Sequence, residues 1–209
     1  MLHEGVMMIK NIVFDMGGVL IRFDQKFFIE RLGISGEDAA LLTREVFRSI
    51  EWCQMDRGTL EEEEAFARIR RRLPSHLHDA AEKLIQMWDR PILPIPGMEE
   101  LVARLKERGY RIFLLSNASR RQPEYWARVP VARYFEDTLV SSFYQIVKPM
   151  PEIYRLAFEK FGIDPAESLF IDDLPVNCEA AVFCGMDAVV FQGDAAALAE
   201  ALREKGVRV

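Results

Sequence analysis

Five short apolar segments, each ending on small or polar residues, constrain the fold more than any other feature of this sequence. They are residues 9–14, 111–115, 138–140, 168–171 and 188–191. Short apolar runs bounded by Gly, Ser, Asn or Asp are typical of buried β-strands. Apolar stripes at helical spacing lie between the later segments. We therefore expect an α/β fold with a doubly wound, mainly parallel sheet.

Residues 24 to about 90 interrupt this alternation of strands and helices. Their apolar side chains recur at helical spacing in four stretches and indicate no strand; the stretches are residues 27–32, 41–47, 60–69 and 84–88. A proline-rich stretch, residues 91–97, follows them. We predict a helical cap over residues 23–91, inserted into an α/β core formed by residues 7–22 and 92–209.

Length and charge exclude several classes of protein. A chain of 209 residues, 50% of them hydrophobic, has room for one full core and a smaller added unit. Its 27 basic and 33 acidic residues give a formal net charge of -6, so nucleic acid is not an expected partner. No stretch reaches the roughly 18 apolar residues needed to cross a bilayer, so no membrane association is expected.

The cysteines and the amino-terminal residues indicate a compartment. Cys53, Cys178 and Cys184 form no CxxC pair, which is typical of proteins in a reducing environment. Residues 1–10 carry an acidic residue within a short apolar stretch and do not resemble a signal peptide; Met7 or Met8 is an alternative start. We expect a cytoplasmic protein, and the sequence does not indicate its oligomeric state.

Aspartates follow two of the expected strands. Asp15 ends the first apolar segment and precedes Gly17 and Gly18, which allow the backbone to turn sharply and approach a ligand. Asp172 and Asp173 end the fourth segment, and the carboxyl ends of parallel strands meet in one crevice. Two neighbouring carboxylates favour a divalent cation with oxygen ligands. The structural alternatives are a turn that Asp15 stabilises and a helix start at the acidic pair.

A lysine and a Ser-Asn pair add groups that suit an anion. Lys148 is followed by Pro149 and Pro151, which restrict the backbone around it, and a rigidly held lysine can act as a point charge for a phosphate. Ser116 and Asn117 follow the second segment and can offer a hydroxyl and backbone amides to an oxyanion. Taken alone, Lys148 could equally be a solvated loop residue, and the pair a helix cap.

These residues occur in a distinctive order along the chain. Asp15-Met16-Gly17-Gly18-Val19-Leu20 comes first, Leu115-Ser116-Asn117 second, Lys148-Pro149 third, and Phe170-Ile171-Asp172-Asp173 with Asn177 last. In this order they resemble the four motifs of the haloacid dehalogenase superfamily, over essentially the whole chain. The helical insert after the first motif is similar to that family's cap. Among subgroups, the chain most resembles phosphatases of the glucose-1-phosphatase kind and the phosphatase domain of soluble epoxide hydrolases.

The resemblance implies a magnesium-dependent phosphatase acting on a small phosphorylated metabolite, with a sugar phosphate as the expected substrate. Asp15 would be the nucleophile and would form an aspartyl-phosphate. Ser116 and Asn117 would bind the oxygens of the transferring phosphoryl group, and Lys148 would neutralise them. A carboxylate can approach a dianionic phosphate only if cations offset the repulsion, which agrees with these roles.

The resemblance also implies a set of Mg²⁺ ligands. Asp15, the backbone carbonyl of Gly17 and Asp173 would bind the ion, and Asp172 and Asn177 would support it or its waters. One position departs from the family pattern, because its phosphatases usually carry a second Asp at the position of Gly17. That Asp serves as the proton donor and acceptor, a role usually worth about 10²- to 10⁴-fold in rate.

The departure at Gly17 leaves several hypotheses open. Asp24, the nearest carboxylate, could replace the missing Asp, or water could suffice for a substrate with a good leaving group. Alternatively, the protein is weakly active or only binds a phosphorylated ligand. A 2-haloacid dehalogenase also lacks the second Asp, but it has no use for the acidic pair. We further predict that residues 51–52 and 55–58 form a polar break between cap helices and contribute to specificity.

Overall fold

The computed structural model describes residues 8–209, so the predictions for residues 1–7, including a start at Met7, lie outside the described residues. Five strands form one parallel sheet in the order β3-β2-β1-β4-β5. They are β1 (Asn11–Phe14), β2 (Arg111–Ser116), β3 (Asp137–Val140), β4 (Ser168–Asp172) and β5 (Asp187–Val190). The predicted α/β fold with a parallel sheet is confirmed, because each apolar segment forms one of these strands.

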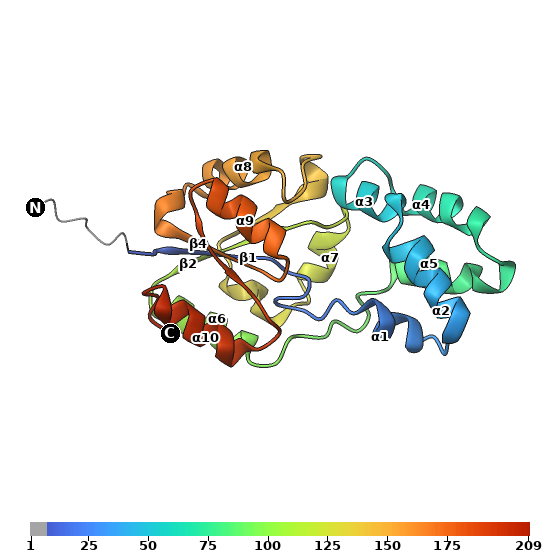
Figure 1. The fold of residues 1–209 in the computed structure, drawn as a ribbon, viewed down its shortest axis with the longest axis horizontal. Helices are drawn as coiled ribbons and strands as arrows, with labels where there is room; N and C mark the ends of the chain where they lie inside the picture. The colour runs from blue at the N-terminus through green and yellow to red at the C-terminus, as the bar shows by residue number, and fades with distance from the viewer. Residues whose placement is uncertain (1–7) are drawn as a thin grey trace, which may run out of the picture.

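Helices cover both faces of the sheet, as Figure 1 shows. Along β1, Ile12 and Phe14 point into one apolar cluster and Val13 into another, as the alternation of side chains along a strand requires. The first cluster includes α6 (Met98–Glu107), α7 (Gln122–Trp126) and α10 (Ala195–Glu204). The second includes α8 (Pro151–Phe161) and α9 (Pro175–Phe183). Burial on both faces explains why the strand segments are almost continuously apolar.

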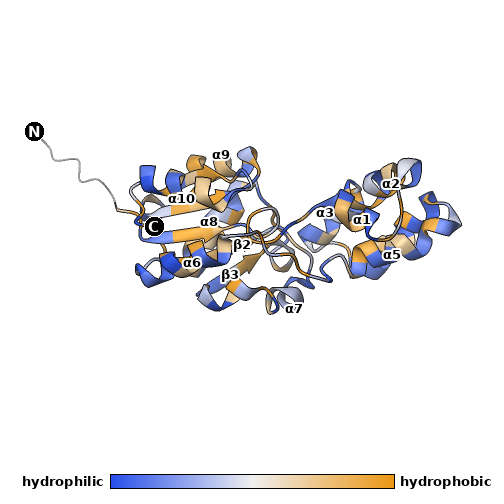
Figure 2. Ribbon diagram, turned by 90° about the horizontal axis from the view of Figure 1, so that it is seen from below, coloured by the Kyte–Doolittle hydropathy of each residue, from blue (hydrophilic) through white to orange (hydrophobic). Residues whose placement is uncertain are grey.

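A separate group of helices follows β1 in the chain. It consists of α1 (Gln25–Glu30), α2 (Gly36–Leu42), which continues into a π-helical turn (Thr43–Phe47), α3 (Ile50–Arg57), α4 (Glu62–Ile69) and α5 (His78–Gln86). Their apolar faces bury one another in a cluster of their own, and Figure 2 shows apolar and polar residues interspersed along these helices. The predicted polar break formed by residues 51–52 and 55–58 is wrong, because these residues belong to one helix. Ser49 Oγ accepts from the Trp52 amide at 3.1 Å to cap α3, which continues to Arg57 and ends at its C-cap, Gly58.

The chain leaves and rejoins the core through two adjacent segments. The Arg22 amide donates to the Leu93 carbonyl at 2.7 Å, and the Ile95 amide donates to the Leu20 carbonyl at 3.0 Å. Two short connections placed side by side suit a cap that moves as a unit relative to the core. They support a division near residues 22 and 92, which stays a prediction, and residue 7 lies outside the described part of the chain.

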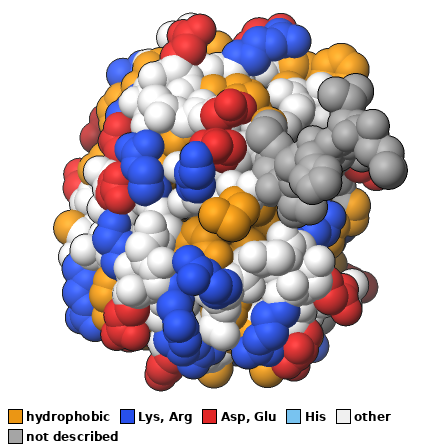
Figure 3. Space-filling model, turned by 90° about the vertical axis from the view of Figure 1, so that its left-hand side faces the viewer, with side chains coloured by type: hydrophobic (Ala, Val, Ile, Leu, Met, Phe, Trp, Pro, Cys, Tyr) orange, Lys and Arg blue, Asp and Glu red, His pale blue; other side chains and the backbone are white. Residues whose placement is uncertain are grey.

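The end of the core away from the cap carries charges of both signs. Figure 3 shows basic and acidic side chains interspersed there around a small apolar area, with part of the face covered by residues outside the described range. The visible part of this face therefore shows no concentrated charge of one sign. Within residues 8–209, every helix is too short or too polar to cross a membrane.

Candidate active site

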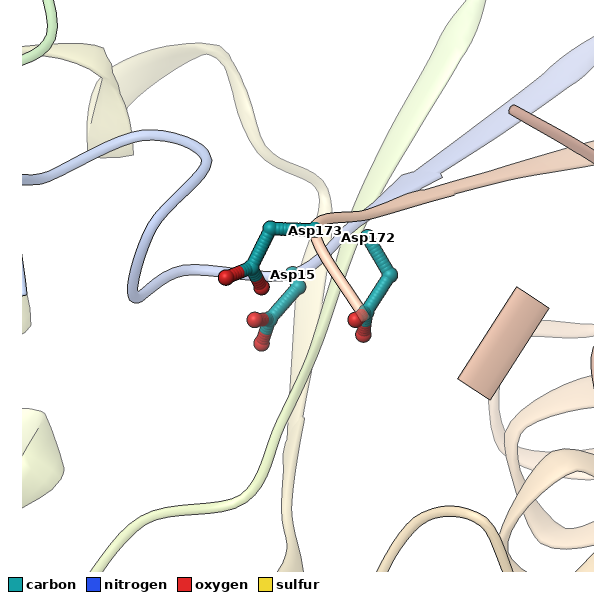
Figure 4. Close-up of side chains that lie close together, drawn as sticks. All are labelled: Asp15, Asp172 and Asp173. Atoms are coloured by element: carbon teal, nitrogen blue, oxygen red, sulfur yellow. The ribbon is translucent and has the colours of Figure 1, made fainter. Parts of the chain in front are cut away.

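Three carboxylates gather at the carboxyl ends of β1 and β4 (Figure 4). Asp15 follows β1, Asp172 ends β4 and Asp173 follows it. One carboxylate oxygen from each of the three lies within 4.8 Å of the others. The two strands are paired in register, Phe14 opposite Ile171, so the sheet itself brings these side chains together. The predicted convergence of the two Asp motifs is therefore what the structure shows.

Lys148 lies between two of these carboxylates. Its Nζ is 2.7 Å from Asp15 Oδ1 and 2.7 Å from Asp172 Oδ2, and its side chain is 1% exposed. Burial alone would lower the pKa of Lys148, but the charges of Asp15 and Asp172 outweigh burial and raise it. The lysine is therefore a fixed positive charge and not a solvated loop residue.

Asn117 holds the Lys148 loop against the end of β2. Its Nδ2 donates to the Lys148 carbonyl at 3.0 Å, and its Oδ1 accepts from the Lys148 amide at 2.8 Å. Asn117 also lines the cavity described below, whereas Ser116 is buried at the end of β2 and does not line it. Binding of phosphoryl oxygens by Ser116 and Asn117 stays a prediction. The side-chain amide of Asn117 also positions Lys148.

Asp172 is held by its neighbours more tightly than Asp173. The Asn177 Nδ2 lies 2.9 and 3.0 Å from the two Asp172 oxygens, and the Leu174 amide donates to Oδ1 at 2.9 Å. Asp173 lines the cavity, and among residues 8–209 it forms no ion pair with Lys148. Asp173 and Asp15 are thus open to a ligand, and Asp172 is placed to fix Lys148.

The glycines after Asp15 have different steric surroundings. Gly18 has φ +81°, and a Cβ there would lie 2.5 Å from Asp173 Oδ2, so only glycine lets this turn approach the acidic pair. Gly17 also lines the cavity, but a Cβ at this position would meet only Phe23 Cβ, at 3.5 Å, and Phe23 Cγ, at 3.8 Å. A side chain at position 17 is therefore sterically tolerable. The absence of a carboxylate there leaves this position without a proton donor or acceptor.

The donor set fits a magnesium ion. The carboxylates of Asp15 and Asp173 are hard oxygen donors, and within residues 8–209 Lys148 is the one positive side chain that pairs with the cluster that they form with Asp172. Burial and the charge of Asp172 raise the pKa of Asp173. Burial also raises the pKa of Asp15 to about 7, with Lys148 acting against it and Asp172 reinforcing it. Excess negative charge of this kind is relieved by a divalent cation.

We predict that magnesium changes the pH dependence of stability. Between about pH 4 and about pH 7, the metal-free folded protein retains a proton on Asp15 that the unfolded chain has released, so its stability falls as pH rises. The raised pKa of Asp173 acts in the same direction. Bound Mg²⁺ offsets the negative charge of the carboxylates, so they no longer retain protons in this pH range. The increase in Tm on adding Mg²⁺ in place of chelator is expected to grow with pH, and to shrink in Asp15→Asn. A magnesium effect that does not vary with pH would contradict this account.

A cavity of about 420 Å³ opens above the carboxylates, between the core and the cap. The core contributes Asp15, Asn117, Ser119, Lys148 and Asp173. The cap side contributes mainly apolar surface with two carboxylates: Phe23, Trp52, Met55, Trp88, Asp56 and Glu62. Charged groups thus lie at the floor of the cavity and apolar rings above it, an arrangement typical of a small-molecule site.

Sequence reasoning located some cavity residues and misplaced others. Trp52, Met55 and Asp56, predicted as part of the specificity segments, do line the cavity. Glu51 is buried away from it and pairs with Arg72 at 2.8 Å. Glu62 is a cavity residue that the sequence does not reveal, since its position in an acidic run indicates only a solvated helix face; it binds Arg121 at 3.1 Å.

Asp24, one hypothetical replacement for the missing Asp at position 17, has a structural role in the cap. It caps α1 by accepting from the Phe27 amide at 3.0 Å and also pairs with Arg22. The hydrogen bond from Arg22 lowers the pKa of Asp24 below its usual range. Asp24 does not line the cavity that contains Asp15. It is therefore an unsuitable replacement for a carboxylate at position 17.

The carboxyl end of α3 rests directly on the core. Arg57 Nε donates to the Gln145 carbonyl at 3.0 Å, and Arg120 Nη2 donates to the Gly58 carbonyl at 3.3 Å. A Cβ on Gly58 would lie 2.0 Å from the Ser142 carbonyl oxygen, and Gly58 has φ +75°. Close packing at Gly58 therefore sets the distance between α3 and the floor of the cavity.

We expect Gly58→Ala to lower kcat/KM by about 10²-fold, because displacement of α3 by about 1 Å misplaces the cavity wall. Gly33→Ala is the matched control, since Gly33 lies in the cap with φ +76° and a Cβ at this position would have no heavy atom within 4 Å. The control bears the same backbone strain without the clash. Equal losses of activity in the two variants would contradict a special role for the contact at Gly58.

The chain belongs to the haloacid dehalogenase-like hydrolase family, whose model matches residues 9–185. It is similar to a glyceraldehyde 3-phosphate phosphatase of Pyrococcus abyssi, 31% identical over 47% of this chain and 42% of that protein. It is also similar to a D-ribitol-5-phosphate phosphatase of Bacteroides thetaiotaomicron, 26% identical over 79% of this chain and 84% of that protein. The chain thus spans less than half the length of the first of these relatives.

A solved structure resembles this chain over most of its length. An enzyme of the same family from Bacteroides thetaiotaomicron, determined in complex with magnesium and inorganic phosphate, superposes with a TM-score of 0.68 and 27% identity. The match covers 91% of this chain and 98% of that one. Both the core and the helical insert are therefore shared with a family member that holds magnesium and phosphate.

Proposed function

We propose that this protein is a magnesium-dependent phosphatase that hydrolyses a small phosphate monoester through a phosphorylated Asp15. One observation carries the proposal: Asp15 is buried at a strand end, 2.7 Å from Lys148 and beside the acidic pair, on the floor of a cavity that the cap covers. This arrangement supports a reaction in which Asp15 is the nucleophile, Lys148 the fixed cation and the acidic pair a source of oxygen donors for a metal. The phosphatase names of two relatives support the same reaction.

The residues would divide the reaction between them. The substrate phosphoryl group would lie between Asp15 and Lys148, and a carboxylate oxygen of Asp15 would attack phosphorus. Lys148 would offset negative charge on the phosphoryl oxygens, and Asn117 would keep its loop in place. Asp15 and Asp173 would hold Mg²⁺, with the Gly17 carbonyl as a further ligand, and the bound ion supplies charge neutralisation for the phosphoryl group.

The cavity above the carboxylates favours a compact organic leaving group. Trp52 and Trp88 line the cavity with aromatic rings against which the C–H face of a sugar can pack, and Glu62 adds a hydrogen-bond acceptor for a hydroxyl. The relatives named above act, by their names, on phosphates of three- and five-carbon compounds. A sugar phosphate or a similar small phosphate ester is therefore the proposed substrate.

A panel of sugar phosphates, nucleotides and a 2-haloacid, each assayed with Mg²⁺ and with excess chelator, tests the function. We expect phosphate release from one or more sugar phosphates only with Mg²⁺, and no halide release. Halide release without metal would identify a dehalogenase, for which the acidic pair has no evident use. Tight phosphate binding without turnover of any ester would identify a non-catalytic binder. Either result would contradict the proposal.

A further inference from the structure

The cavity contains more carboxylates than the metal and the nucleophile require. Asp15 pairs with Lys148 at 2.7 Å, and Asp173 belongs to the acidic cluster. Glu62 accepts from Ser119 Oγ at 2.9 Å and pairs with Arg121 at 3.1 Å. Among the cavity-lining carboxylates of residues 8–209, this leaves Asp56 without an ion pair and outside the metal cluster.

Asp56 is held in place by the core although it belongs to the cap. It lies in the last turn of α3, and its backbone carbonyl accepts from Ser141 Oγ. Ser141 also accepts from the Ala118 amide at 3.0 Å, so one buried hydroxyl joins the loop after β2 to the cap. The neighbouring contacts of Arg57 and Gly58 fix the same turn. The backbone at Asp56 thus has a defined position, and its side chain lines the cavity.

We propose that Asp56 is the general acid and base of the reaction, and that the cap thereby supplies the carboxylate that Gly17 lacks. The assignment rests on the proposed function. In the first step the bond between Asp15 and phosphorus forms, the ester P–O bond breaks, and the leaving oxygen takes the proton of Asp56. In the second step water attacks phosphorus, the bond to Asp15 breaks, and the water proton returns to Asp56.

The electrostatic surroundings of Asp56 suit both steps. Burial and the charge of Asp15 raise the pKa of Asp56 to about 7, while Lys148 and the Trp52 side chain act in the opposite direction. Tyr125 faces the same cavity, and burial and the charge of Asp56 raise its pKa, so it remains neutral. Glu62 is neutralised by Arg121. A carboxyl group poised near neutrality can both donate and accept a proton.

This assignment links proton transfer to the position of the cap. The nucleophile and Lys148 belong to the core, whereas the proton donor belongs to α3. The leaving group would therefore be protonated only when α3 rests on the core, at the moment when the cavity is covered. Opening of the cap after the first step would remove the base and delay hydrolysis of the phosphorylated enzyme.

The test compares Asp56→Asn with the native protein at saturating Mg²⁺, on aryl phosphates with acidic leaving groups and on alkyl or sugar phosphates. We expect turnover of the alkyl esters to fall about 10²- to 10⁴-fold, and formation of phosphorylated enzyme from the aryl esters to be nearly unchanged. Phosphorylated enzyme should then accumulate, because its hydrolysis lacks the base. Asp79→Asn, an exposed cap residue paired with Lys83, is the control and should behave as native.

A second variant keeps the test independent of structural damage. Gly17→Asp in the Asp56→Asn background should restore part of the turnover of alkyl esters, since position 17 has room for a side chain. A loss that is equal for all leaving groups, without accumulated phosphorylated enzyme and without repair by Gly17→Asp, would overturn the role of Asp56. If the native protein released no phosphate from any ester, the proposed function would fail as well, and the two failures are thus distinguishable.

Discussion

Asp15→Asn is expected to abolish phosphate release while leaving the fold intact. The amide has nearly the shape of the carboxylate but cannot attack phosphorus, so turnover should fall by at least about 10⁴-fold. Burial and the charge of Asp172 outweigh the attraction of Lys148 and raise the pKa of Asp15, and Lys148 keeps its partner Asp172, so removing the charge of Asp15 should not lower the Tm. Phosphate release under saturating substrate and Mg²⁺, together with thermal unfolding, measures both effects.

Asp194→Asn provides the control for the change at Asp15. Asp194 caps α10 by accepting from the Ala196 amide at 2.8 Å and does not line the cavity, and Asn serves equally well as a helix cap. Its activity should equal that of the native protein. An Asp15→Asn variant that retained a tenth or more of the native activity would exclude Asp15 as the nucleophile, since such a loss is only about 1.4 kcal/mol of transition-state stabilisation.

Lys148→Met is expected to impair both stability and catalysis. Methionine nearly fills the volume of the buried lysine stem but leaves Asp15 and Asp172 without the charge that lies 2.7 Å from each. Removing one partner of a buried ion pair costs about 3–5 kcal/mol in the free energy of unfolding. Loss of a fixed charge at the phosphoryl oxygens should lower kcat by about 10³-fold.

Denaturant unfolding with chelator and with Mg²⁺ measures the stability part of this prediction. Mg²⁺ should recover part of the loss in Lys148→Met, because it supplies positive charge to the same carboxylates. Lys160→Met is the control: Lys160 pairs with the partly exposed Asp137, and surface pairs contribute about 0–1 kcal/mol. Equal losses in the two variants would show that the charge of Lys148 has no special structural role.

The sheet could be predicted because its physical cause is local. Strands buried on both faces must be apolar along their length, and chain direction then requires their polar ends to meet at one edge. Asp15 and Asp172 were therefore predictable as neighbours from their positions after apolar segments. The helical nature of the insert was predictable for the same reason, from the spacing of its apolar residues.

The cap side of the cavity depends on contacts that no local pattern encodes. The polar residues Glu51 and Asp56 suggest a break where α3 lies, whereas Glu51 is satisfied by Arg72 and Asp56 lies in the cavity wall. The proximity of Asp56 to the floor depends on Gly58 packing against Ser142. These two residues lie far apart in the sequence and share no motif. Only the three-dimensional arrangement distinguishes Asp56 from Asp24.

The most direct measurement is a search for a phosphoryl group on Asp15 during turnover. Native protein mixed with a phosphate ester and Mg²⁺, quenched in acid within the first turnovers and mapped by mass spectrometry, should carry one phosphoryl group on the peptide that contains Asp15. The group should be absent when chelator replaces Mg²⁺ and in Asp15→Asn. Metal-dependent release of phosphate with no phosphorylated peptide, or with the group on another residue, would contradict the central claim.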